Sequence, residues 1–417
     1  MPAQPPLDRP SPPLRRHLGL PSAIAIGLAS TLGAGVFVVW GPAAEAAGSG
    51  AALLAALAAA GLVAYCNADS SARLAVRHPR AGGAYVYGTE RLHPAAGFAA
   101  GWGFLVGKTA SAAVMALTFG HYLLPGHYRA LAVAVVIALC AVNLLGVKRT
   151  AVAAAIFASV TVGVLAAVVI AGLAGPGAGQ GLDRGQPWGV LTAAGFLFFA
   201  FAGYARIATL GEEVKRPEWT IPRAVPIALA ITFTVYAVVA VTALSVLGTG
   251  TLAGSKTPLA VLAAAGAPAL EPLVAVGAGI AVAGVLLSLL AGIGRTALAM
   301  ARDRRLPGGL AAVSERFGVP WVAELIVSAV VIAIVVTFDL AAAIGFSSFC
   351  ALVCYAIANA AATTLERRTP VPWIGMAGCL LIAASLPPNA VLGGLSVFAI
   401  GAIWYLIGER ARRRPDG

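Results

Sequence analysis

The stretch ASTLGAGVFVVWGP, residues 29–42, lies within the first long apolar run of the chain. Gly33 and Gly35 stand two residues apart near its middle. Glycine is among the poorest helix formers, so this pair is a weak point in an otherwise continuous apolar helix. The sequence therefore predicts a helix that is interrupted near residues 33–36.

The rest of the chain has the composition of a membrane protein. Of its 417 residues, 60% are hydrophobic and 11% are charged, and the mean hydropathy is +0.90. Apolar stretches of about 17–25 residues, the length that crosses a bilayer as a helix, recur from end to end. The short alternating segments of an outer-membrane barrel are not seen. An all-α polytopic membrane protein is predicted.

Twelve apolar stretches are expected to be transmembrane helices of one domain at residues 20–408. They are 20–46, 50–72, 94–119, 129–146, 151–174, 188–211, 224–248, 272–300, 320–337, 340–364, 371–386 and 390–408. Residues 1–19 are proline-rich and basic, and are expected to be a disordered cytoplasmic segment rather than a signal peptide. Residues 409–417 are expected to be a basic cytoplasmic tail.

The positions of Lys and Arg predict the orientation. With the N-terminus in the cytoplasm, 23 of the 28 Lys and Arg residues fall on the cytoplasmic side, and only Arg129, Arg184 and Lys256 fall outside. The asymmetry explains the net charge of +12 without a nucleic-acid partner. The abundance of Ala, Gly and Arg suggests a bacterium with GC-rich DNA. We therefore expect a multi-pass protein of a bacterial cytoplasmic (inner) membrane, with both termini cytoplasmic.

A second glycine, Gly203, interrupts the sixth span, five spans after the first break. An inverted repeat would place two such breaks opposite each other near the bilayer midplane. Unwinding exposes N–H groups that suit a carboxylate and carbonyls that suit an ammonium group, and a membrane tolerates them where they bind something. The pair predicts a transporter site for a zwitterion. Close helix packing is the alternative explanation of these glycines.

Four stretches resemble the amino acid–polyamine–organocation (APC) transporters. They are GAGVF at 33–37, HPRAGGAYVYGTERLHPAAGFAAGW at 78–102, FFAFAGYARIATLGEEVKRPEWTIPRAV at 198–225 and RTALAMARDRRLP at 295–307. The resemblance implies a LeuT-like fold, in which two inverted five-helix repeats, about 20–174 and 188–364, precede two additional helices at 371–408. Helices 1 and 6 would be broken. It also implies an amino acid or related amine as substrate.

The same resemblance implies the residues of the binding site. The substrate carboxylate would meet the backbone of Gly33, Ala34 and Gly35, and the amino group would meet carbonyls near Thr31, Leu32, Phe198 and Phe201 and the break at Gly203. Phe199 falls where related antiporters keep an aromatic gate, although lipid-facing or packing roles are the alternative for Phe199 and Phe201.

The chain also departs from the family. Many members carry an acidic residue after the sixth-helix glycine, where this chain has Ala205 and then Arg206. Proton-coupled relatives can carry a lysine midway along the fifth helix, where this chain has Ser159 and Thr161 but no charge. Neither of those coupling mechanisms transfers directly.

Charged and polar residues inside spans are the remaining candidates. Lys108 lies about 21 Å into the third span, and a charge at that depth is usually functional. It could bind a carboxylate, or titrate and couple transport to protons. Snorkelling toward the cytoplasm is the alternative. Arg206 is expected to form a structural ion pair, and Glu212 and Glu213 are expected to pair with cytoplasmic arginines.

Ser288 lies where sodium-coupled relatives of the fold hold an ion. A serine bonded to a carbonyl of its own helix is the favoured alternative. Proton coupling and sodium coupling therefore both stay open, with Lys108 and Ser288 as the candidate residues.

Other classes of function lack their residues. The histidines lie in loops or at span ends, which disfavours a membrane-embedded enzyme. The five cysteines have no spacing typical of a zinc site or a disulfide framework, and no ATP-binding Walker motif is present. No cofactor and no metal are expected. A channel remains possible only through an oligomer. The sequence predicts a secondary permease, and leaves open the substrate and whether it is imported, exported or exchanged.

Overall fold

The computed structural model describes residues 18–78, 82–146, 151–175, 187–204, 207, 214–366 and 369–413. Within these ranges every regular element is a helix. The α-helices are α1 (Leu20–Thr31), α2 (Trp40–Ala47), α3 (Gly50–Arg77), α4 (Ala84–Arg91), α5 (Pro94–Leu123), α6 (Tyr128–Leu144), α7 (Ala151–Leu173), α8 (Pro187–Phe201), α10 (Pro217–Gly254), α11 (Pro258–Gly266), α12 (Glu271–Arg302), α13 (Trp321–Thr337), α14 (Leu340–Thr363), α15 (Val371–Ala384) and α16 (Pro388–Arg413). The 3₁₀ helices are η1 (Ala34–Phe37), η2 (Pro125–His127), η3 (Ala202–Tyr204), η4 (Pro268–Leu270) and η5 (Gly308–Ala311).

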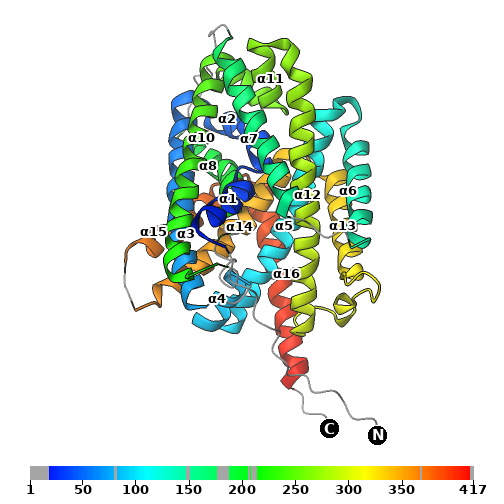
Figure 1. The fold of residues 1–417 in the computed structure, drawn as a ribbon. Helices are drawn as coiled ribbons and strands as arrows, with labels where there is room; N and C mark the ends of the chain where they lie inside the picture. Colours follow the sequence, from blue (N-terminus) through cyan, green and yellow to red (C-terminus); the bar gives the residue numbers. More distant parts are fainter. Residues whose placement is uncertain are drawn as a thin grey trace.

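Each of the twelve predicted apolar stretches contains a helix. In the described part of the chain, eight helices are long and apolar enough to cross a membrane, and four shorter apolar helices of 10–17 residues accompany them. The long helices lie side by side in one bundle, with α2 and α11 near one end and α4 near the other (Figure 1). The protein is thus an all-helical, multi-pass membrane protein, as the composition predicted.

Two short helices were not predicted. Helix α4 lies between the second and third spans, and α11 lies between the seventh and eighth. A search for bilayer-length apolar runs misses both, because α4 has eight residues, including Glu90 and Arg91, and α11 has nine. The two helices lie at opposite ends of the bundle, and these ends are therefore called the α4 end and the α11 end (Figure 1).

Small residues hold the centre of the bundle together. Helix α5 is the most buried of the eight long helices and packs along α14. A Cβ added to Gly107 of α5 would lie 2.7 Å from the Cβ of Cys350 on α14, so glycine lets the two backbones approach closely. One turn further along α5, the Ser111 hydroxyl shares a hydrogen bond of 2.7 Å with the Ser347 hydroxyl of α14. Ser347 also donates to the Gly107 carbonyl at 3.0 Å.

All five cysteines are buried and carry free thiols. Cys350 and Cys354 pack inside the helix bundle. Both lie on the side of α14 that faces α5, since the Cys354 thiol donates to the Ala100 carbonyl at 3.3 Å.

Candidate functional site

The first apolar run is interrupted in the structure where the glycines predicted it. Helix α1 ends at Thr31, Leu32 and Gly33 leave the helix, and η1 begins at Ala34. Gly33 has an extended backbone, with φ −62° and ψ −157°. The N–H groups at the start of a helix have no acceptor within it, and no acceptor for the Gly33 or Gly35 N–H is found among the described residues. The side chain of Ala34 lies outside the described structure.

The sixth span changes its helix type at its own glycine. Helix α8 ends at Phe201, and the 3₁₀ turn η3 continues through Gly203 to Tyr204. The residues that come next in the chain include Ala205, Arg206, Glu212 and Glu213, which lie outside the described residues. The ion pairs predicted for Arg206 and the two glutamates therefore stay predictions.

The two interruptions lie directly against each other. A Cβ added to Gly35 would lie 2.8 Å from the Cα of Ala200 on α8. A Cβ added to Gly203 would overlap the carbonyl oxygen of Ser30 on α1. Gly35 and Gly203 are therefore required for the contact between the two segments, whatever else they bind. Gly33 is less confined, because its nearest neighbour would be the Val285 side chain at 3.2 Å.

Tyr236 of α10 connects the two interrupted segments. Its hydroxyl lies 2.7 Å from the Thr31 carbonyl oxygen and 3.1 Å from the Ala200 carbonyl oxygen, and can donate to either. Its ring packs edge-on against Trp40 and Phe201, at centroid distances of 6.2 and 5.1 Å. The Thr31 carbonyl, which the resemblance assigned to the substrate amino group, is thus already a hydrogen-bond acceptor for a side chain.

Two further tyrosines bind the same segments from unbroken helices. The Tyr122 hydroxyl of α5 donates to the Phe37 carbonyl of η1 at 2.8 Å. The Tyr355 hydroxyl of α14 donates to the Ala202 carbonyl of η3 at 3.4 Å. The sequence analysis missed all three tyrosines. A tyrosine within an apolar span is the sequence feature that could have predicted them, because a buried hydroxyl in a membrane protein has to find a hydrogen-bond partner.

The predicted aromatic residues differ in their surroundings. Phe198 is fully buried and packs edge-on against Tyr355, with ring centroids 5.8 Å apart. Phe201 is buried against Tyr236, whereas Phe199 is half-buried at the edge of the core. The side chains of Thr31 and Leu32 are also buried. Of the three phenylalanines, Phe199 is therefore the one with exposed surface.

Lys108 lies on the inner face of α5, near the middle of that helix. Phe104 and Tyr122 are about five helical turns apart and therefore lie on the same face of α5. At Tyr122 this face meets η1, because the Tyr122 hydroxyl donates to the Phe37 carbonyl. Lys108 follows Phe104 by about one turn, and its Nζ lies 5.9 Å from the Phe104 ring centroid. The Lys108 side chain is half-buried, and no ion pair from it is found in the described ranges. Lys108 thus lies about four helical turns from Tyr122, toward the α4 end.

Ser288 lies on the face of α12 that meets the first interruption. Val285 contacts Gly33, and Ser288, Gly292 and Arg295 follow on the same face and are exposed. No hydrogen bond from the Ser288 hydroxyl is found among the described residues. The alternative of a core serine bonded to its own helix carbonyl does not fit the exposure of Ser288.

The inner faces of α5 and α12 differ in side-chain exposure between the two ends of the bundle. Toward the α11 end, Phe37, Trp40 and Tyr122 are buried. Toward the α4 end, Phe104 is 41% exposed and Ser288 is exposed. Side chains on these inner faces are thus buried toward the α11 end and more exposed toward the α4 end. In the described residues, no group of His, Cys, Asp and Glu side chains could hold a metal ion.

Comparison with known proteins agrees with this architecture. The family described as "Amino acid permease" matches residues 18–412. An uncharacterized transporter of Mycobacterium tuberculosis is 53% identical over 420 residues, covering 97% of this chain and 94% of the relative. The branched-chain amino acid permease BcaP and the methylthioribose transporter of Bacillus subtilis are 25% and 24% identical, each over 95% of this chain and 94% of the relative. These relatives are transporters and not enzymes, and with the match over nearly its whole length the chain belongs to the amino acid permease family, within the APC superfamily.

Proposed function

We propose that the protein is a secondary active transporter that moves an amino acid or a related amine by alternating access, with its substrate site at the paired interruptions. One observation carries the proposal. The interrupted segments touch at Gly35 and Gly203, and a single tyrosine hydroxyl reaches a carbonyl of each. Non-helical backbone at membrane depth is tolerated where it is buried in protein or lines a binding cavity.

We assign the chain a LeuT-like architecture of twelve membrane helices. The first repeat would run over about 20–174 and the second over about 188–364, so the interruptions would fall in the first helix of each. Helices α15 and α16 would be the two additional helices. The position of the interruptions, in the first and sixth of the twelve apolar stretches, supports this assignment.

The substrate carboxylate is proposed to bind the N–H groups at the start of η1, those of Ala34 and Gly35, where the helix end is positive. The amino group is proposed to meet carbonyls of Leu32 and of the α8 end, near Phe198 and Phe201. The Thr31 carbonyl would be available only if the Tyr236 hydroxyl turned toward Ala200. Phe199, with its exposed surface, is the proposed gate.

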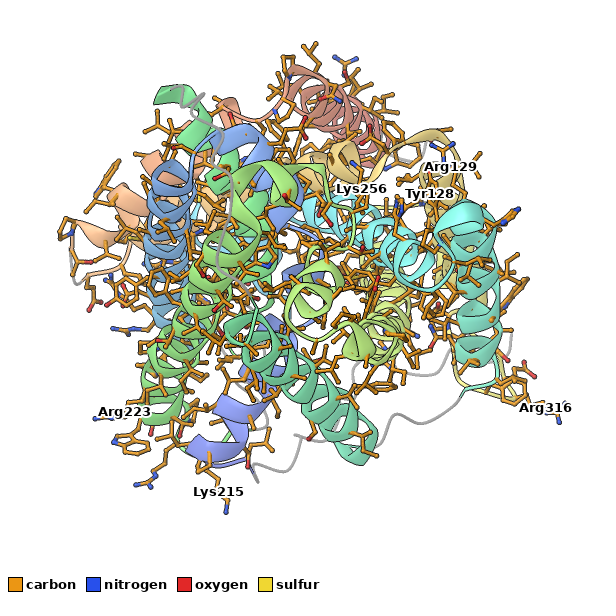
Figure 2. The ribbon with its side chains drawn as sticks, turned by 90° about the horizontal axis from the view of Figure 1, so that it is seen from above. Tyr128, Arg129, Lys215, Arg223, Lys256 and Arg316 are labelled. Atoms are coloured by element: carbon orange, nitrogen blue, oxygen red, sulfur yellow. The ribbon has the colours of Figure 1, made fainter. Side chains whose placement is uncertain are left out.

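The α4 end is proposed to face the cytoplasm. Most basic residues of the described loops lie there, and Figure 2 shows Lys215, Arg223 and Arg316 pointing outward from the perimeter of the bundle. The positive-inside rule then makes this the cytoplasmic side of a bacterial inner membrane. The exposure of Phe104 and Ser288 would make the structure an inward-facing state.

Coupling is proposed to involve Lys108 for a proton or Ser288 for sodium. Both lie on the inner faces of their helices, where Lys108 is half-buried and Ser288 is exposed. Ser288 is closer to the first interruption along its helix, since Val285 contacts Gly33 one turn away.

The test is transport by purified protein in proteoliposomes, with and without a proton or sodium gradient. Because relatives are named for branched-chain and cationic amino acids and for methylthioribose, the panel should contain each of these classes. We expect saturable uptake of at least one amino acid or amine, and counterflow would separate exchange from uniport or export. Protein that inserts correctly but moves none of the panel under any gradient would contradict the proposal.

Side-specific labelling tests the proposed orientation and state. The five native thiols are buried, so Ser288→Cys would add one exposed thiol. A membrane-impermeant thiol reagent should modify it from the cytoplasmic side of membrane vesicles. Ser347→Cys, at a buried position on α14, is the matched control and should stay unmodified. Labelling of Ser288→Cys only from the outside would contradict the orientation.

A further inference from the structure

A cavity at the α4 end lies apart from the interruptions. Its volume is about 210 Å³, and its lining joins α5 at Phe98, the segment after α12 at Arg304 and Arg305, and α16 at Trp404 and Ile407. At about 30 Å³ for each water molecule, this space exceeds what one or two waters fill. One side of the lining is apolar or aromatic, and the other carries guanidinium groups.

Arg304 occupies a backbone position at which glycine is the usual residue. It follows the end of α12 with φ +55°, in the left-handed region. The N–H of Arg304 bonds the Ala301 carbonyl at 3.0 Å, and the N–H of Arg305 bonds the Met300 carbonyl at 2.8 Å, which together form a Schellman cap. A side chain at the left-handed position of that cap is disfavoured relative to glycine. Arg304 therefore adopts a backbone conformation that is unfavourable for a residue with a side chain.

The cavity lies where the apolar surface of α16 ends. Ile400, Ile403 and Ile407 are each 58–60% exposed along that helix, and Glu409 and Arg410 follow. Trp404 is 44% exposed, and its Nε1 donates to the Arg305 carbonyl at 2.9 Å. Tryptophan with its ring in the apolar layer and its N–H toward polar groups is typical of the membrane interface.

The charge around the cavity is positive. Residues 302–305 and 408–410 contain four arginines and two acids, a net charge of +2. Arg305 pairs with Glu409 at 3.1 Å and lies 5.1 Å from the Tyr405 ring centroid, which fixes one guanidinium in the wall. Arg305 and Glu409 cancel each other, and the net charge of +2 of the two segments favours an anion at the cavity.

We propose that this cavity binds the headgroup of one anionic phospholipid, with its phosphate at Arg304 and its acyl chains along the exposed isoleucines of α16. A lipid satisfies both halves of the lining at once, because its anionic head meets the guanidinium groups and its chains continue onto the apolar surface. A free anion would leave the aromatic and isoleucine side uncovered. The bound lipid would brace α16 against α5 and the segment after α12.

The test uses the full chain in a nonionic detergent, with either palmitoyl-oleoyl phosphatidylglycerol or palmitoyl-oleoyl phosphatidylcholine added. Native mass spectrometry counts retained lipids, and a melting curve reports stability. The parent should retain one phosphatidylglycerol in preference to phosphatidylcholine. Arg304→Gly should weaken phosphatidylglycerol binding about fivefold or more, the equivalent of about 1 kcal/mol for one arginine at an anionic surface.

The melting temperature of Arg304→Gly in phosphatidylcholine should equal or exceed that of the parent, because glycine suits the left-handed cap. Arg304→Asn, which also tolerates that conformation, should lose phosphatidylglycerol binding to the same degree. The matched control is Arg316→Ala, an exposed arginine of the same loop that points away from the bundle and stacks on Phe317 at 5.1 Å (Figure 2).

The control should change phosphatidylglycerol binding less than about twofold, since one exposed charge contributes only through the diffuse surface potential. Unchanged binding in Arg304→Gly, or an equal loss in Arg316→Ala, would overturn the proposal. A fall in the melting temperature of both Arg304 variants in phosphatidylcholine would also overturn it, because the arginine would then be structural.

Discussion

Replacing Tyr236 with phenylalanine removes a hydroxyl that reaches both interrupted segments. The ring stays, and its contacts with Trp40 and Phe201 are retained, so no cavity larger than the hydroxyl is created. What is lost is a buried hydroxyl at 2.7 Å from the Thr31 carbonyl and 3.1 Å from the Ala200 carbonyl. Leaving a buried carbonyl without its donor costs about 1–3 kcal/mol.

A loss of about 1–2 kcal/mol has two readouts. It should lower the free energy of unfolding by that amount, which is a substantial part of a total of about 5–15 kcal/mol. If substrate binds at the interruptions, the same amount should weaken apparent affinity about 5- to 30-fold, because the ends of α1 and α8 are no longer held at a fixed separation. The assay is initial uptake against substrate concentration in proteoliposomes, using the substrate that the panel identifies, together with a melting curve.

Tyr122→Phe is the matched control. It removes an equally buried hydroxyl, at 2.8 Å from the Phe37 carbonyl, but this hydroxyl touches only one of the two segments. We expect a similar loss of stability and a smaller loss of affinity. Equal affinity in Tyr236→Phe and the parent, with normal insertion, would refute the idea that the tyrosine positions the site.

Five further substitutions test four of the site residues. Gly35→Val should abolish uptake, because its Cβ would lie 2.8 Å from the Cα of Ala200. Gly33→Ala should keep a measurable part of the uptake, because only the Val285 side chain has to move. Equal uptake by the two variants would contradict the packing argument. Lys108→Ala should slow uptake and remove its dependence on external pH. Lys108→Arg should not restore that dependence, because arginine keeps its proton. Identical pH profiles in the parent and both variants would make Lys108 structural. Ser288→Ala should abolish any stimulation of uptake by a sodium gradient, and full stimulation in that variant would exclude the hydroxyl as an ion ligand.

The fold was predictable where the physics is local to a segment. Bilayer-length apolar runs predict membrane helices because each must satisfy its own backbone in lipid, and all twelve contain a helix. The break at Gly33 and Gly35 was predictable for the same reason, since glycine weakens the helix that contains it. Helices α4 and α11 escaped because they are too short to cross a membrane.

The site was less predictable because its contacts join distant segments. The sequence explained Gly35 by close approach of a ligand, whereas in the structure the space beside it belongs to Ala200. The surroundings of Ser288 depend on which face of α12 is left unpacked, and no spacing along one helix contains that information. The phenols of Tyr122, Tyr236 and Tyr355 lie up to 205 residues from the carbonyls that they bind.

Unwinding a membrane helix leaves carbonyls without donors, and here tyrosines of three other helices supply them. Helices α5, α10 and α14 each contribute one tyrosine, to Phe37, to Thr31 and Ala200, and to Ala202. These bonds stabilise the interruptions without a substrate, and a substrate amino group at the proposed site would have to compete with a phenol for the Thr31 carbonyl. The start of η1 has no such competitor, since no acceptor for the Gly35 N–H is found in the described ranges. We therefore expect the carboxylate rather than the amino group to contribute most of the binding energy, so that removing the substrate's carboxylate should weaken binding more than methylating its amine.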